Sequence, residues 1–118
     1  MRISEVDFGA RQPVEGYGPD FFRLGGQTHT APLLVAPGIV QGWGGYSDRD
    51  TLLALAGQVD VLLIGTGGQV AHIPADLRAV LEEAGLGVES MDSPAACRTY
   101  NVLLSEARRV ALAVLPVG

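Results

Sequence analysis

The C-terminal stretch "DSPAACRTYNVLLSEARRVALAVLP", residues 92–116, contains the signals of a complete helix followed by a strand. Ser93 and Pro94 predict the helix start as N-cap and first helical residue, because serine accepts a backbone hydrogen bond there and proline needs none. The spacing predicts a helix from Pro94 to about Ala107 with one apolar side that packs on a sheet. That side consists of Ala96, Tyr100, Leu103, Leu104 and Ala107. The run "RVALAVLPV" then predicts a closing strand.

Upstream of this stretch, helices and strands alternate. The apolar run at 61–64 predicts a strand buried on both faces of a parallel sheet. "PADLRAVLEEAG" predicts a helix that ends at Gly85, and "GLGVES" predicts a short strand. Ser47 and Asp50 predict a capping box at the start of an earlier helix. The second half therefore reads as βαβαβ with right-handed crossovers onto a parallel sheet.

The first half is rich in hairpin signals. Gly25-Gly26 predicts a two-residue turn, and Pro37-Gly38 predicts a type II turn between strands at 33–36 and 39–43. We expect these hairpins to extend one edge of the sheet, which makes the sheet mixed. Helices on its faces would complete a layered α/β fold in a single domain, residues 1–118.

Composition excludes several classes of protein. Hydrophobic residues make up 47% of the 118 residues, the net charge is -5, and all eight basic residues are arginines. An acidic chain with scattered arginines offers no surface for nucleic acid or anionic lipid. One cysteine excludes an internal disulfide, and no apolar run approaches the ~18 residues of a membrane span. We expect a cytoplasmic protein.

The sharpest candidate site is a glycine-rich turn, residues 65–68, directly after the buried strand. If the strands at Val61 and Val88 are parallel neighbours, this turn and the start of the last helix share one edge of the sheet. Backbone N–H groups there could bind a small anion, but a tight structural turn is the interpretation that a lone G-x-G favours. The candidate ligand-binding residues are Gly65, Thr66, Gly67, Gly68, Asp92, Ser93, Tyr100, Asn101 and Trp43.

Nucleotide-binding motifs fit this turn poorly. A P-loop needs a lysine, which the chain lacks, and Val70 stands where a dinucleotide fingerprint needs its third glycine. No catalytic residue, metal ligand or cofactor is predicted. Cys97 is expected to be a buried side chain, and His29 and His72 lack the spacing of metal ligands.

Two candidate residues keep alternative interpretations. Trp43, flanked by glycines, predicts either an exposed anchor for a partner or a ring that closes the core. Asn101 predicts either a side chain that secures a neighbouring backbone or one that reaches the cleft.

Two segments carry a family resemblance. "LLIGTGG", followed by "ESMDSPAACRTYNVLLSEARRVALAVLP", resembles the small domain family that includes the mitochondrial complex I assembly factor 3, an adipogenesis-associated protein of animals and many bacterial proteins. The most specific positions are Gly65-Thr66-Gly67, Ser93-Pro94, Ala96, Tyr100-Asn101, Leu103, Glu106 and Arg108.

The resemblance implies a three-layer α/β sandwich and no established active site. Ala107 departs from the glycine that such sequences commonly carry, so the helix end is expected to close differently. We expect a non-enzymatic, assembly-factor-like domain that acts through a protein partner. The alternative is a small-molecule or anion-binding protein, or an enzyme, that uses the turn at 65–68 and the start of the last helix.

Overall fold

The middle of the main sheet is built from strands that are apolar along their whole length. The computed structural model describes residues 12–118, and the five-stranded sheet has the order β5-β4-β8-β6-β7. Its strands are β4 (Leu33–Ala36), β5 (Ile39–Gly42), β6 (Val61–Gly65), β7 (Gly87–Met91) and β8 (Val110–Val114). β6 is parallel to both β7 and β8, whereas β4 is antiparallel to both β8 and β5. The predicted mixed sheet with a parallel βαβαβ second half is confirmed.

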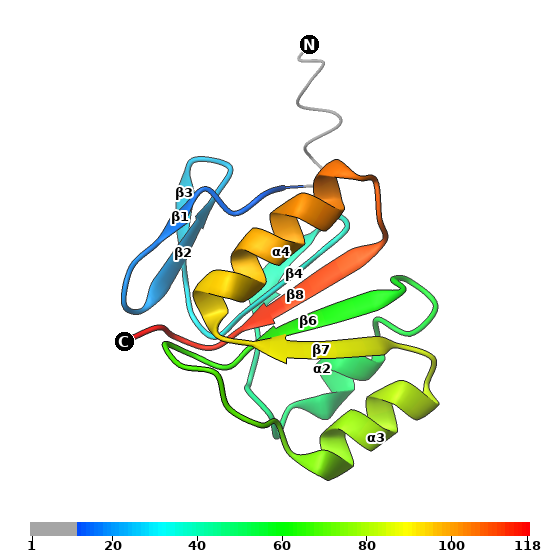
Figure 1. The fold of residues 1–118 in the computed structure, drawn as a ribbon. Coiled ribbons are helices and arrows are strands. Elements are labelled where there is room, and N and C mark those ends of the chain that lie inside the picture. The colour runs from blue at the N-terminus through cyan, green and yellow to red at the C-terminus, as the bar shows by residue number, and fades with distance from the viewer. Residues whose placement is uncertain (1–11) are drawn as a thin grey trace.

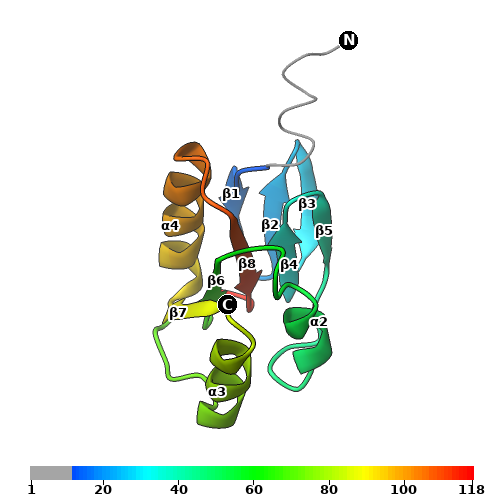
Figure 2. The ribbon, with the colours of Figure 1, turned by 90° about the vertical axis from the view of Figure 1, so that its right-hand side faces the viewer.

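Layers on both faces of this sheet explain why its central strands are so apolar. Alternate residues of a strand point to opposite faces. Leu62 and Ile64 lie in the core shared with α2 (Arg49–Leu53) and α3 (Ala75–Glu83), and Leu63 lies in the core shared with α4 (Ser93–Ser105). Figures 1 and 2 show α4 on one side of the sheet and the two shorter helices on the other. The predicted three-layer sandwich is therefore confirmed.

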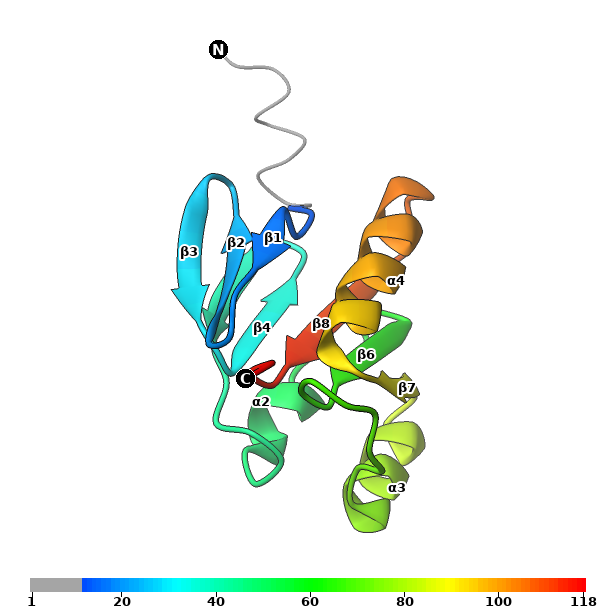
Figure 3. The ribbon, with the colours of Figure 1, turned by 60° about the vertical axis from the view of Figure 1, so that its left-hand side comes forward.

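The first hairpin does not join the main sheet. β1 (Gly16–Tyr17), β2 (Phe21–Leu24) and β3 (Gln27–Thr30) form a separate three-stranded sheet, which lies near β4 and α4 in Figure 3. Phe22 and Leu24 pack into the core on the α4 side of the main sheet, while Arg23 between them is exposed. The expectation that both hairpins extend one edge is wrong for this one, because its apolar face packs across the core.

The turns themselves agree with the glycine signals. Gly25 and Gly26 have φ angles of 60° and 78°, and Gly38 has a φ of 73° after Pro37. β4 and β5, joined by Pro37-Gly38, form the hairpin that does extend the main sheet. The second hairpin therefore behaves as predicted.

The start of α2 differs from the predicted capping box. Asp48, not Ser47, occupies the N-cap position. Its carboxylate accepts hydrogen bonds from the Thr51 hydroxyl at 2.8 Å and from the backbone N–H of Gly44 at 3.0 Å. These bonds lower the pKa of the Asp48 carboxyl, the Thr51 bond having the larger effect. The Ser47 cap is wrong because Asp48 is better placed to bond both the helix and the loop before it.

The start of α4 is displaced by one residue from the prediction. Asp92 is the N-cap, and its carboxylate accepts a hydrogen bond from the backbone N–H of Ala95 at 2.7 Å. Ser93 is thus the first helical residue, and its hydroxyl is left to bond elsewhere. No helix within residues 12–118 has the length and apolar character needed to cross a bilayer.

α4 ends with a residue in the left-handed conformation that glycine usually adopts at this position. Ala107 has a φ of 61°, and its N–H donates to Leu104 at 3.0 Å while the N–H of Arg108 donates to Leu103 at 3.0 Å. This pair of bonds is a Schellman motif. The expected different closure is wrong: alanine adopts the left-handed conformation in which glycine carries no Cβ strain.

Candidate functional site

The glycine turn and the start of α4 meet at one edge of the main sheet. β6 and β7 are parallel neighbours, and Gly65, the last residue of β6, is paired with Met91, the last residue of β7. The N–H of Ser93 donates to the carbonyl of Gly67 at 2.7 Å, and the N–H of Gly67 donates to the Ser93 hydroxyl at 3.0 Å. The predicted juxtaposition of these two corners is confirmed.

Ser93 also connects this corner to the C-terminal segment. Its hydroxyl donates to the carbonyl of Leu115 at 2.8 Å, and the residue is 0% exposed. One hydroxyl thus satisfies a backbone donor from the turn and a backbone acceptor from the segment after β8. The two bonds hold three distant parts of the chain together.

Close packing accounts for the glycines of the turn. A Cβ atom on Gly65 would lie 2.7 Å from the Ser93 hydroxyl oxygen and 2.8 Å from its Cα. A Cβ on Gly68 would lie 2.5 Å from the carbonyl oxygen of Val117, and Gly67 has a φ of 108°. Each position therefore excludes a side chain for a reason internal to the fold.

Thr66 closes the turn with its hydroxyl. Its oxygen lies 2.7 Å from the carbonyl of Gln69 and 3.2 Å from that of Met91, and it accepts a hydrogen bond from the N–H of Ala71 at 3.1 Å. Its backbone N–H donates to Met91 at 2.8 Å. The polar groups of Thr66 are thus engaged by the turn and by the end of β7.

Tyr100 and Asn101 bond residues of the N-terminal segment. The Tyr100 hydroxyl donates to the carbonyl of Gln12 at 3.1 Å, and its side chain belongs to the core at 1% exposure. The Asn101 amide donates to the carbonyl of Val14 at 2.8 Å and accepts from the N–H of Val14 at 2.9 Å. Of the two interpretations of Asn101, the structure shows the side chain that secures a neighbouring backbone.

Trp43 closes the core. Its ring is 4% exposed, and its Nε1 donates to the carbonyl of Asp48 at 3.4 Å. The ring meets Tyr46 edge-on at a centroid distance of 6.1 Å, and burial raises the pKa of the Tyr46 hydroxyl. Gly45, with a φ of 82°, reverses the chain beside it. The interpretation of Trp43 as an exposed anchor is wrong.

The remaining reactive side chains named from the sequence are Cys97, His29 and His72. Cys97 is 4% exposed, and burial raises the pKa of its thiol to about 12 although Arg98 opposes this shift. The predicted buried cysteine is confirmed. His72 is exposed and His29 is half-buried. Within residues 12–118, no group of three or more His, Cys, Asp or Glu side chains could hold a metal ion.

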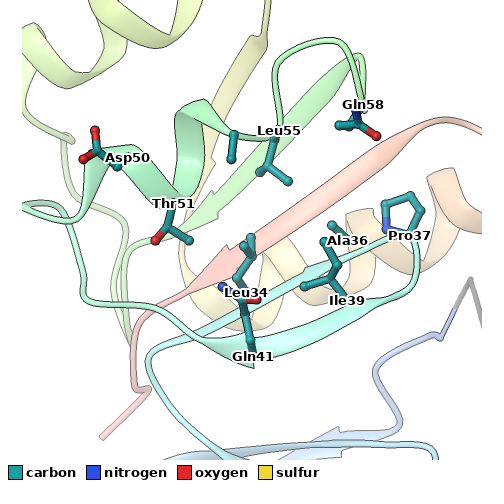
Figure 4. A pocket seen from close by; sticks show the side chains of 10 residues that line it. Leu34, Ala36, Pro37, Ile39, Gln41, Asp50, Thr51, Leu55 and Gln58 are labelled. Carbon is teal, nitrogen blue, oxygen red and sulfur yellow. The ribbon is translucent and has the colours of Figure 1, made fainter.

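A pocket lies between α2 and the edge of the main sheet, and it was not predicted from the sequence. Its volume is about 530 Å³. Figure 4 shows Leu34 and Ile39 from the sheet below Leu55 from the segment after α2. The sequence carries no local signal for the pocket, because Ile39 beside the Pro37-Gly38 turn is apolar like a buried strand residue and only the structure shows it exposed.

Known proteins share both the sequence and the fold of this chain. An uncharacterised protein of Rhodobacter capsulatus is 47% identical over 117 residues, which cover 99% of this chain and 94% of that protein. NADH dehydrogenase [ubiquinone] 1 alpha subcomplex assembly factor 3 of Danio rerio is 32% identical over 98% of this chain and 71% of its own length.

A solved structure extends this likeness to the fold. A Bartonella henselae protein described as an outer membrane protein is 34% identical, covers 93% of this chain and 98% of its own, and superimposes with a TM-score of 0.84. Residues 14–115 match the protein family of unknown function DUF498/DUF598. The resemblance seen in the glycine turn and the last helix is thus confirmed, and the chain belongs to the DUF498/DUF598 family.

Proposed function

We propose that this chain is a non-enzymatic binding domain that supports the assembly of a larger protein complex through direct protein contacts. The observation that carries the proposal is the 32% identity to the Danio rerio assembly factor over 98% of this chain. The aligned region spans nearly the whole chain, and so it includes the residues at the surface of the fold. The proposed partner class is accordingly the subunits or other assembly factors of an NADH dehydrogenase.

The geometry of the glycine corner supports a structural use of the residues that carry the family resemblance. Ser93 joins the turn to Leu115, and Asn101 holds the backbone of Val14 with two hydrogen bonds. Polar groups engaged in this way maintain the fold, and the proposed binding then depends on the surface that the fold presents.

Purification from the native cell tests the proposal. A chromosomally tagged chain, isolated under mild conditions, is expected to bring down one partner at a fixed molar ratio. Deleting the gene is expected to reduce the amount of assembled NADH dehydrogenase on native gels. Recovery of the chain alone, together with normal assembly in the deletion strain, would exclude this role.

Cellular location is part of the same proposal. We propose that the chain acts in the cytoplasm, where its partner would be assembled. Fractionation of the native cell, followed by immunoblotting, is expected to find the chain in the cytoplasmic fraction. Recovery in the outer membrane fraction would contradict this location.

The second candidate function is a small-ligand site at the same corner. Gly68, Gln69 and Val70 are exposed at the end of β6, beside the start of α4. Of the predicted set, a ligand there would use Gly65, Thr66, Gly67, Gly68, Asp92 and Ser93, because Trp43 closes the core and Tyr100 and Asn101 bond the N-terminal segment. An anion would meet the charge of Asp92, which already caps α4, so a protein-binding role fits the geometry better.

A thermal-shift measurement tests the ligand hypothesis. A panel of inorganic phosphate and small carboxylates should raise the melting temperature, since a ligand at a hundredfold its Kd adds about 2.7 kcal/mol of stability. Thr66→Val should abolish the increase, and Thr28→Val in β3 is the matched control. Equal responses of the two variants would assign the effect to another part of the surface.

A further inference from the structure

β5 is an outer strand of the main sheet. One hydrogen bond shows which of its backbone N–H and C=O groups face β4 and which face away. The N–H of Trp43, directly after β5, donates to the carbonyl of Pro32 at 3.1 Å. In an antiparallel pair, alternate residues direct their N–H and C=O groups to the partner strand. The N–H and C=O groups of Ile39 and Gln41 therefore bond β4, whereas those of Val40 and Gly42 point away from the sheet. Within residues 12–118, no strand pairs with this outer edge.

The pocket of about 530 Å³ lies directly beside this edge. Leu34 and Ala36 line it from β4, and Leu55 lies opposite them on the segment after α2, as Figure 4 shows from close by. Ile39 and Gln41 line it from β5, and the remaining lining residues are Pro37, Asp50, Thr51, Ala54 and Gln58. Ile39 is 38% exposed, which is unusual for an isoleucine beside a core. The short helix α2 thus leaves Ile39 of β5 open to a side chain from outside, whereas Leu34, Ala36 and Leu55 beside it are at most 5% exposed.

The charge around the pocket selects between candidate occupants. Asp50 is the one charged side chain in the lining, and it is exposed. A second copy of this chain carries the same net charge of -5, so the two copies as wholes would repel each other. A basic partner segment, by contrast, would be attracted to Asp50.

We propose that β5 and this pocket bind an extended segment of a partner protein. The segment adds a strand to the outer edge of β5 by bonding the N–H and C=O groups of Val40 and Gly42. It places one apolar side chain in the pocket, and a lysine or arginine two residues away lies near Asp50. Alternate residues of a strand share one face, so both side chains point toward α2. Strand addition beside a side-chain pocket is an established mode of peptide recognition. The inference rests on the proposed protein-binding function.

Short synthetic peptides test this mode directly. The probe is the acetylated heptapeptide Thr-Lys-Thr-Leu-Thr-Lys-Thr, in which leucine and both lysines share one face. Titration into the ¹⁵N-labelled full chain is expected to shift the amide resonances of Val40 and Gly42. Replacing the peptide's leucine by alanine should weaken binding at least about tenfold, because the buried apolar area is lost.

Backbone pairing is tested without altering the protein. N-methylation of the peptide groups that face β5 removes donors and should abolish binding. N-methylation of the alternate groups, which face solvent, should leave binding within about threefold of the parent peptide. Equal effects of the two modifications would overturn the strand-addition geometry.

Two protein variants test the pocket and the charge. Ala54→Phe fills the pocket from α2's end and should abolish binding, while Ala79→Phe makes the same exchange at an exposed residue of α3 and should not. Asp50→Lys should weaken binding of the lysine peptide and strengthen binding of a peptide with glutamates in place of its lysines. Unchanged binding by Ala54→Phe, or no charge reversal with Asp50→Lys, would overturn the proposal.

The free protein provides the remaining outcomes. Slow amide exchange of Val40 and Gly42 in a monomer would mean that another part of the chain covers the edge. Concentration-dependent shifts of the same amides would mean that a second copy does, and either result overturns the proposal. A native partner that binds Ala54→Phe as well as the unaltered chain would exclude this surface while leaving the proposed assembly role intact.

Discussion

The Ser93 hydroxyl lies 3.0 Å from the backbone nitrogen of Gly67 and accepts its hydrogen bond, so the first turn of α4 is tied to the turn after β6. The same hydroxyl donates to Leu115. Both bonds lie between segments far apart in the sequence. The corner that carries the family resemblance is therefore a structural junction, and its stability can be tested residue by residue.

Ser93→Ala should lower the free energy of unfolding by about 2 kcal/mol, because it leaves the N–H of Gly67 and the carbonyl of Leu115 without their partner. Urea denaturation followed by circular dichroism measures the change. Ser105→Ala removes an exposed hydroxyl from the end of the same helix and should stay within about 0.5 kcal/mol. A similar loss of unfolding free energy in both variants would contradict the structural role of the Ser93 hydroxyl.

Gly65→Ala should destabilise the fold by about 1 to 3 kcal/mol, since the added methyl group meets the backbone of Ser93 and the side chain of Val114. Thermal unfolding measures it. Gly16→Ala is the control, because nothing lies within 4 Å of the added atom. If Gly65→Ala had the same melting temperature as the unaltered protein, β6 and α4 would have to lie farther apart than described.

Asn101→Ala should release the N-terminal segment from α4. The variant loses both hydrogen bonds to Val14, at a cost of about 1 to 2 kcal/mol. Amide exchange measured by NMR should become faster at Val14, while the amides of β6 keep their protection relative to global stability. Arg98→Ala, at an exposed position of α4, should leave the exchange at Val14 unchanged.

Ala107→Gly should stabilise the protein by about 0.5 to 1 kcal/mol, because glycine carries no Cβ strain at a φ of 61°. The gain is smaller than the full strain energy, since glycine also makes the unfolded chain more flexible. Ala79→Gly, inside α3, should cost about 1 kcal/mol. Chemical denaturation should show changes in unfolding free energy of opposite sign for the two variants. Changes of the same sign would contradict the left-handed conformation of Ala107.

Cys97 should make stability fall at alkaline pH. Burial raises the pKa of its thiol from 9.0 to about 12, so the folded state keeps a proton that the unfolded state releases. Its contribution to stability is full below pH 9 and is lost as the pH rises toward 12. Urea denaturation across this range should show a steeper decline for the unaltered protein than for Cys97→Ala. Parallel declines would show that another group causes the slope.

Much of the fold could be predicted because its signals are local. The run at 61–64 is apolar at every position, which a strand covered on both faces requires, and the structure buries Leu62, Leu63 and Ile64 completely. The Gly25-Gly26 turn was recognisable for a similar reason, because two adjacent residues with positive φ favour glycine. Parallel pairing of β6 and β7 then followed from the short crossover.

The mistaken predictions came from signals that several arrangements satisfy. Ser47 and Asp48 both suit a helix start, and the fold of the Gly44 loop selects the second. The first hairpin could have joined the edge of the main sheet, but Phe22 and Leu24 instead pack against the α4 side, where they are 0% and 1% exposed. Trp43 among glycines allowed exposure, but the structure buries it in the core with Tyr46 edge-on to its ring.

By itself, the sequence determined the alternating strands and helices of the second half and the corner where β6 and β7 end. Periodic burial and turn chemistry act over a few residues, so they can be read along the chain. Only the tertiary structure decided that Ser93 would join that corner to Leu115, and that α2 would leave a pocket beside β5. Both features depend on how segments distant in sequence dock, because packing of the whole core, rather than local preference, sets their separation.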